Sequence, residues 1–284
     1  AFNKIQSWST SMSTNGFIRR CFRNYRLYHN ADPYSQINSY WGDFGISGEN
    51  GEYMNVKINH FRNILTHIMN MIFSKLPIPK SRAKNSSAAS IESVEICDAL
   101  LENLFQSKGG MATKHLRKAS ELSMVMGTGA VLMEWDSGGG EEYIKDEQGR
   151  SYFTGDLRIR SLGITDFYVD TSIQDWDDTN WVIVRESINK FKLASQYPDL
   201  SERILSEKNN DRLGRTFDMF DRNTTDEIYT YKFYHKKVNG LLPDGRFCYF
   251  LENDVIMYDG ENPYGDLPVF LVKPSEGLGT IYGY

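Results

Sequence analysis

The feature that most constrains the fold is a change in the period of the apolar residues at Gly127 and Gly129. Before these glycines, apolar residues recur at the three- and four-residue spacing of α-helices. After them, short apolar segments alternate with polar residues and are separated by Gly, Asp or Asn, which is typical of β-strands. The sequence therefore predicts an α+β fold, with a helical part at residues 1–126 and a β-rich part with one helical insertion at residues 127–284.

Helices are expected in four stretches of the first part. Residues 15–29 place apolar side chains on one face and arginines on the other, which indicates a basic amphipathic helix. Residues 55–77 carry a continuous apolar stripe, which predicts a long buried helix. Ser90 is expected to cap the next helix, which two glycines close, and a further helix covers residues 112–126.

Short strands are expected in the second part, with the turn signal "LPDGR" between two of them. One helical insertion, residues 189–207, has Asn189 as its cap and a break at Pro198. Surface loops are expected from Lys208 to Glu227 and in the aromatic-rich segment that starts at Asn30. The expected strands lie at residues 130–135, 141–147, 151–155, 157–163, 166–170, 181–187, 228–240, 246–260 and 267–274.

Charge is distributed unevenly along the chain. The net charge is −5, but residues 1–91 contain eleven basic and four acidic side chains, so they carry +7 and the remainder carries −12. Such an asymmetry can pair copies of the chain head to tail or present the basic part to nucleic acid or to an acidic partner, and solvated helix faces are the ordinary alternative. The 13% aromatic content, with 17 Tyr, favours protein interfaces.

Features that the sequence lacks disfavour several protein classes. No stretch approaches the roughly 20 apolar residues of a membrane-spanning helix, and the N-terminus lacks the apolar core of a signal peptide. Cys21, Cys97 and Cys248 are isolated and odd in number, so we expect reduced, mostly buried thiols and no disulfide framework or zinc site. Because the chain lacks an initiating Met and ends within a glycine-rich phrase, we expect it to be part of a longer polypeptide.

Two phrases have the spacing of ligand sites. "GLGTIYG" is one residue off the dinucleotide-binding fingerprint, but no helix opens after it, so nucleotide binding is not expected. "DWDDTNWVIVRE" places Asp175, Asp177, Thr179 and Glu186 at the spacing of a calcium loop. Asn180 stands where that loop needs glycine, and the strand-like alternation after it aims Glu186 by sheet geometry, so a structural acidic turn is expected. The five His residues are scattered, and no catalytic residue or cofactor is predicted.

The order of phrases in residues 55–284 resembles the portal proteins of tailed bacteriophages, especially those with short tails. The likeness begins with "NVKINHFRNILTHIMNMIFSKLPIPKSRAKNSSAA", a helix that runs into a Pro-bounded segment, and continues with the turn, strand and hairpin of "MVMGTGAVLMEWDSGGG". It then includes the aspartate-bearing turn, strand and helix of "ITDFYVDTSIQDWDDTNWVIVRESINKFKLASQYPD" and the hairpins and "LP" strand from Tyr229 onward. The sequence departs from the family where Ile164 and Thr165 replace a common proline and where the long helix after "YG" is missing.

The resemblance implies a non-enzymatic structural subunit: an N-terminal helical segment and a β-rich wing domain of a portal-like fold, truncated before the stem helices, which lie beyond Tyr284. It implies a homo-oligomeric ring, typically of twelve copies, at the portal vertex of the virion capsid, made in the host cytoplasm. The implied partners are the major capsid protein, terminase, tail or adaptor proteins, and non-specific double-stranded DNA passing through the channel, with no membrane.

The resemblance also assigns roles to particular residues. Candidate contacts with capsid, neighbour or DNA are the helix arginines Arg19, Arg20, Arg23 and Arg26. A joint between wing and stem is expected, with Gly277, Gly279 and Gly283 making it flexible and Pro268 and Pro274 stiffening its approach. The alternatives are another virion adaptor or scaffold protein, and an enzyme with a calcium or nucleotide site on the acidic turn or the terminal glycines.

Overall fold

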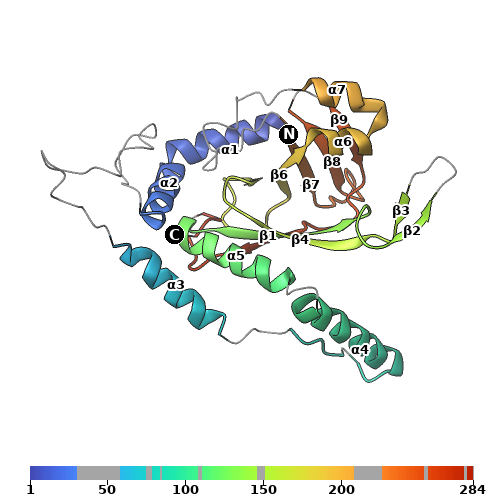
Figure 1. Cartoon of the computed structure of the whole chain (residues 1–284), viewed down its shortest axis with the longest axis horizontal. Helices are drawn as coiled ribbons and strands as arrows, with labels where there is room; N and C mark the ends of the chain where they lie inside the picture. Colours follow the sequence, from blue (N-terminus) through green and yellow to red (C-terminus); the bar gives the residue numbers. More distant parts are fainter. Residues whose placement is uncertain are drawn as a thin grey trace, which may run out of the picture.

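The computed structural model describes residues 1–30, 58–74, 79–83, 85–107, 111–145, 151–207, 226–252, 255–277 and 280–283, and its fold is α+β (Figure 1). Helices form the N-terminal part and antiparallel sheets dominate the rest, as the change of period at Gly127 and Gly129 predicts. The helices of the first part are α1 (Phe2–Thr14), α2 (Phe17–Tyr28), α3 (His60–Ile72), α4 (Ala88–Glu102), a π-helical turn (Asn103–Ser107) and α5 (Met111–Met126).

Three antiparallel sheets follow within the described residues. They have the strand orders β10-β1-β4, β2-β3 and β5-β6-β7-β8-β9. The strands are β1 (Gly129–Asp136), β2 (Glu142–Lys145), β3 (Ser151–Phe153), β4 (Asp156–Leu162), β5 (Phe167–Val169), β6 (Trp181–Asn189), β7 (Glu227–His235), β8 (Arg246–Leu251), β9 (Ile256–Gly260) and β10 (Val269–Val272). Each lies where the alternating pattern predicts a strand.

The helical insertion is confirmed in detail. It consists of α6 (Lys190–Gln196), a 3₁₀ turn (Pro198–Leu200) and α7 (Ser201–Ser206), so the chain breaks at the proline as predicted. The Asn189 side chain caps α6 by accepting a hydrogen bond of 3.0 Å from the backbone N–H of Phe191.

The five-stranded sheet is covered on both faces. Along β7 and β8, buried side chains alternate between two clusters, with Tyr231 and Phe250 in one and Ile228 and Leu251 in the other. Helix α1 covers the first face, and α6 and α7 cover the second (Figure 1). Helix α1 was not predicted from the sequence, and its buried side chains are Ile5, Trp8 and Met12.

Helix α5 packs against the three-stranded sheet, where a glycine permits close approach. A Cβ at Gly129 would lie 2.2 Å from the carbonyl oxygen of Ala119, which is a distance that no side chain tolerates. Gly127 has a φ of 83°, in the left-handed region that favours glycine. The predicted close backbone approach is therefore confirmed at Gly129, whereas Gly127 supplies the left-handed turn before it.

One cluster of buried side chains joins residues on both sides of position 126. It contains Trp8 and Met126 from the helices together with Leu132 and Val269 from the three-stranded sheet and Phe167 from the five-stranded sheet. The division of the chain at residue 126 stays a prediction.

Some local expectations were wrong or lie outside the described residues. The cap of α4 is Ser87, whose side chain accepts from the backbone N–H of Ser90, because the helix begins three residues earlier than predicted. Of the three cysteines, only Cys21 is buried, whereas Cys97 is exposed and Cys248 is half-buried. Outside the described residues lie the expected loops at 31–57 and 208–225 and the two closing glycines, Gly109 and Gly110.

Candidate interaction surface

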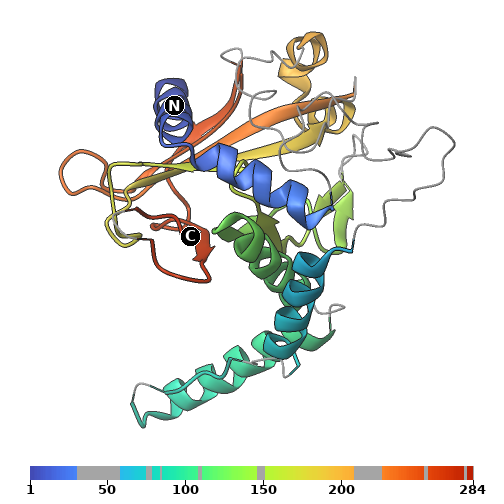
Figure 2. The same ribbon diagram turned by 90° about the vertical axis from the view of Figure 1, so that its left-hand side faces the viewer.

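Helices α3 and α4 and the described residues between them form an arm that leads away from the sheets (Figure 2). We call this segment, residues 58–74, 79–83 and 85–102, the helical arm. Asn59 starts it by capping α3, since its side chain accepts from the backbone N–H of Arg62 at 2.9 Å. The same side chain donates to the carbonyl oxygens of Leu27 and Tyr28, at 3.0 and 2.8 Å, and so joins the arm to α2.

Helix α3 is only partly buried, which corrects the prediction of a long buried helix. Leu65 and Met69 lie one turn apart and are the buried side chains of α3. The rest of its apolar stripe is exposed, because the described part of the chain supplies only a narrow contact with α2 and α5. The exposed apolar side chains of α3 are Phe61, Ile64, Ile68, Met71 and Ile72.

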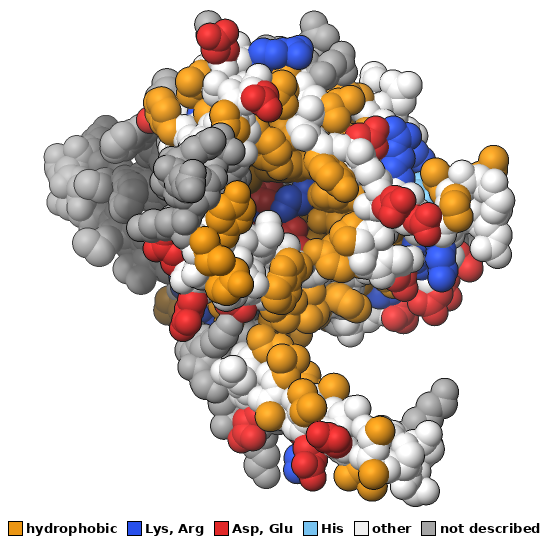
Figure 3. Space-filling view, turned by 90° about the vertical axis from the view of Figure 1, so that its right-hand side faces the viewer, with side chains coloured by type: hydrophobic (Ala, Val, Ile, Leu, Met, Phe, Trp, Pro, Cys, Tyr) orange, Lys and Arg blue, Asp and Glu red, His pale blue; other side chains and the backbone are white. Residues whose placement is uncertain are grey.

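Helix α4 has no buried residue, although it is rich in apolar side chains. Ile96 is 64% exposed and Leu100 is 60% exposed, and Ile91 and Cys97 are exposed as well. A helix of a globular protein normally buries its apolar face, because each apolar side chain moved from water to a packed interior contributes about 1.5–3 kcal/mol. The arm therefore presents an apolar surface that a partner can cover, and hydrophobic side chains run along it in Figure 3.

A second exposed apolar surface lies on the β2–β3 hairpin. Tyr143 is 70% exposed, and Ile144, Tyr152 and Phe153 are exposed as well. Trp135 on β1 is also exposed and packs over Gly155, where a Cβ would lie 2.6 Å from the indole ring. The use of these aromatic side chains in contacts between proteins stays a prediction.

The four candidate arginines lie on α2, as the predicted basic amphipathic helix requires. Its buried face consists of Phe17, Ile18 and Cys21. Burial raises the pKa of the Cys21 thiol to about 12, although Arg20 opposes the shift, so the thiol stays protonated at neutral pH. On the opposite face, Arg19, Arg20 and Arg23 are exposed and Arg26 is half-buried.

The calcium-like phrase does not form a loop around an ion. Asp175 and Asp177 lie exposed in a turn, whereas Glu186 lies on β6 and is 4% exposed. The alternation of β6 directs the Glu186 side chain into a cluster of charges, which confirms the prediction that sheet geometry aims it. Among the described residues, no group of three or more His, Cys, Asp or Glu side chains is arranged to hold a metal ion.

That cluster joins the two larger sheets. Lys232 on β7 contacts Glu134 on β1 at 2.7 Å, and Arg158 on β4 contacts Glu186 at 2.6 Å. Arg160, two residues along β4, also pairs with Glu186. Burial opposes the ionisation of Glu186, but Lys232, Arg160 and Arg158 outweigh it and lower the pKa of the carboxyl. The cluster was not predicted from the sequence, although Arg158 and Arg160 are two residues apart and therefore share one face of a predicted strand.

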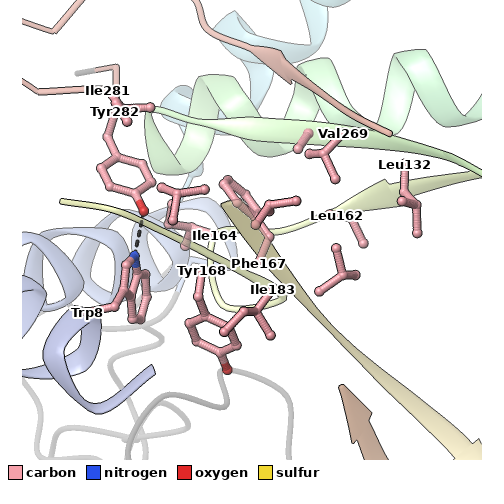
Figure 4. Close-up of a cluster of buried hydrophobic side chains, with 14 of the residues drawn as sticks. Trp8, Leu132, Leu162, Ile164, Phe167, Tyr168, Ile183, Val269, Ile281 and Tyr282 are labelled. Carbon is pink, nitrogen blue, oxygen red and sulfur yellow. Dashed lines mark hydrogen bonds between the residues drawn. The ribbon is translucent and has the colours of Figure 1, made fainter. Parts of the chain in front are cut away.

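The described part of the predicted joint is closely packed. Tyr282 is buried, and its hydroxyl accepts a hydrogen bond of 2.5 Å from the indole N–H of Trp8 (Figure 4). The backbone N–H of Gly283 donates to the side chain of Thr128 at 2.9 Å. A Cβ at Gly277 would lie 1.9 Å from the carbonyl oxygen of Tyr282. These glycines therefore permit close packing, and the role of the segment as a joint stays a prediction.

The other joint residues differ in their surroundings. Pro268 is buried, and its carbonyl oxygen accepts from the backbone N–H of Met133 at 2.9 Å, whereas Pro274 is exposed. Gly279 lies outside the described residues.

None of the described helices combines the length and the apolar character needed to cross a bilayer.

No protein-family model matches this sequence, and a comparison with curated proteins finds no match.

Proposed function

We propose that this chain is a structural subunit that assembles with copies of itself into a closed ring, and that the ring is the portal of a tailed bacteriophage. The observation that carries the proposal is α4, a helix of 15 residues with no buried side chain and with Ile91, Ile96 and Leu100 exposed. Such a helix gains stability only when another surface covers it.

A neighbouring copy is the simplest occupant of this surface. The arm leaves the body on one side, so a copy that receives it offers a different surface, and such head-to-tail contacts close into rings when the rotation allows. The charges of the chain support this arrangement, because residues 1–91 carry +7 and the remainder −12. Opposite charges favour and orient the approach of one copy to the next.

In this proposal, the ring stands at the portal vertex of the virion capsid, after synthesis in the host cytoplasm. Capsid protein, terminase and tail or adaptor proteins bind its outer surfaces, and double-stranded DNA passes through its channel. The exposed arginines of α2, Arg19, Arg20 and Arg23, are candidates for contacts with phosphates or with an acidic partner. Phosphate contacts carry no sequence information, which suits a channel that every sequence must traverse.

Native mass spectrometry and negative-stain electron microscopy of the purified protein test the ring. The informative variant is Leu100→Asp, which places a charge on α4. Its matched control is Leu241→Asp, because Leu241 is 85% exposed in the turn between β7 and β8 and is not part of the helical arm. We expect a ring of about twelve copies for the wild type and the control. Loss of one leucine that the ring contact buries weakens each contact by about 10- to 100-fold. Leu100→Asp should therefore give monomers.

Two outcomes count against the proposal. If the wild-type protein stays monomeric at micromolar concentration, it does not form a ring. If it forms a closed two-fold dimer, the contact is isologous and not head to tail. If both leucine variants assemble like the wild type, α4 is not the contact surface.

A further inference from the structure

A cavity of about 360 Å³ lies between α5 and the strands β4 and β6. Its volume falls within the range of about 300–1,000 Å³ that is usual for small-molecule sites. We call it the α5 cavity. One part of its lining is apolar and consists of Leu122 and Met126 on α5 with the ring of Tyr229 on β7.

The other part of the lining is basic and comes from three elements. His115 and Lys118 lie one turn apart on α5, so they share one face of the helix. Arg160 reaches the cavity from β4 and Arg185 from β6. With one carboxylate, that of Asp166, also in the lining, the charges of the cavity side chains sum to about +2 when His115 is neutral.

The structure holds the two guanidinium groups in place. Arg160 pairs with Glu186 in the charge cluster described above. Arg185 is 3% exposed, lies 3.6 Å from the Asp166 carboxylate and stacks over the Tyr229 ring with 4.7 Å between its guanidinium carbon and the ring centre. Groups that are fixed before a ligand arrives lose less entropy on binding it.

His115 is the natural reporter of this cavity. Its Nδ1 accepts a hydrogen bond of 3.3 Å from the backbone N–H of Ser161, which assigns the proton of the neutral ring to Nε2. Partial burial and the positive charges of Lys114, Lys118 and Arg160 lower the pKa of His115. The pKa of the His115 imidazole therefore reports the positive potential at the place where an anion would bind.

We propose that the α5 cavity binds a small phosphate-bearing anion, with the phosphate group against Lys118 and Arg160 and any apolar or ring part of the ligand against Leu122 and Met126. Ammonium and guanidinium groups donate charge-assisted hydrogen bonds to phosphate oxygens, and the apolar wall suits the remainder of a phosphate ester. The proposal is independent of ring assembly, since one chain supplies all of the lining.

The test follows the ring-proton resonances of His115 by NMR during titration of the protein at constant ionic strength. The probes are inorganic phosphate, AMP and a duplex DNA oligonucleotide, and the Leu100→Asp variant can be used if the wild type forms large rings. We expect saturable shifts with phosphate and with AMP and a rise in the pKa of His115, because a bound anion offsets the nearby cations. Tighter binding of AMP identifies an ester as the ligand, and equal affinity identifies the free anion.

The matched variants are Lys118→Met and Lys114→Met. Both lysines are exposed on α5 one turn apart, and Lys118 alone of the two lines the cavity. We expect Lys118→Met to weaken phosphate binding about tenfold, or about 1.4 kcal/mol. Lys114→Met should change it less than about threefold, because solvent and salt screen an exposed charge that lies outside the lining. Both variants should keep the wild-type melting temperature because both side chains are exposed.

Three results overturn the proposal. They are the absence of a saturable shift with either small anion, equal weakening by the two lysine variants, and a response to duplex DNA alone. The second would mean that phosphate senses only the general charge of α5. None of these results bears on whether the chain forms a ring, which the Leu100→Asp experiment decides.

Discussion

Replacing Tyr282 by Phe removes one atom from the contact that joins the first helix to the last described turn. The hydroxyl of Tyr282 accepts from the indole N–H of Trp8 at 2.5 Å, and both side chains are 1% exposed. The variant keeps the ring but leaves the indole N–H buried without this acceptor. The cost of a buried unsatisfied donor is about 1–3 kcal/mol, so we expect the free energy of unfolding to fall by that amount.

Urea and thermal denaturation measure the effect. For a chain of this size, each kcal/mol lowers the melting temperature by about 2–4 °C, which predicts a decrease of about 2–12 °C. Burial raises the pKa of the Tyr282 hydroxyl, so the hydroxyl stays neutral and the effect should not vary around neutral pH. A double-mutant cycle with Trp8→Phe isolates the pair, with an expected coupling of about 1 kcal/mol, because the double variant has no unpaired N–H.

The control is Tyr143→Phe on the exposed face of β2, where Tyr143 is 70% exposed. Its effect should lie within about 0.5 kcal/mol of zero. If Tyr282→Phe is no less stable than this control, the hydrogen bond does not stabilise the fold and the reasoning fails.

Two further predictions concern charge and thiol reactivity. Glu186→Gln leaves cations of the charge cluster without a counterion and should cost about 3–5 kcal/mol at neutral pH. Since the pKa of Glu186 lies below its ordinary value of 4.5, the wild type should lose this stability as the pH falls through and below that value. The Gln variant should lose less over the same range in urea denaturation curves, because only its other carboxyls, such as Asp170 and Asp259, still titrate there. In the unassembled chain, a maleimide should label exposed Cys97 and leave Cys21 unmodified, as peptide mass spectrometry would report, because burial raises the pKa of Cys21 to about 12. Assembly into a ring should slow the labelling of Cys97 by about tenfold or more, and an unchanged rate would place α4 outside the contact.

Periodicity predicted most elements of the fold, because it reports which face of an element is apolar. The strands and the break at Pro198 follow from local signals, and so does the Asn189 cap. Helix α1 was missed although Ile5, Trp8 and Met12 have helical spacing, since the many polar residues between them weaken the pattern. The apolar stripe of α3 was correctly located but wrongly expected to be buried, because a pattern does not reveal what covers it.

The candidate surfaces depend on contacts between distant parts of the chain, which local patterns do not encode. Glu186 was singled out for a calcium loop, and only the pairing of the sheets places it beside Arg158 and Arg160. On α4, a usable signal was present: Ile91, Ile96 and Leu100 do not fall on one narrow stripe, which is typical of a helix that is covered on more than one side. The sequence therefore indicated that α4 has apolar side chains on more than one side, but not that they are exposed.

The charge cluster also determines how the two larger sheets can move. It takes Glu134 and Arg158 from one sheet and Glu186 and Lys232 from the other, so sliding one sheet past the other separates these ions from their partners and leaves the two buried carboxylates, Glu134 and Glu186, unpaired. A slip of β6 by one residue would turn Glu186 to the opposite face. We therefore expect the two sheets to move together as one rigid unit under mechanical load, while the elements around them deform first.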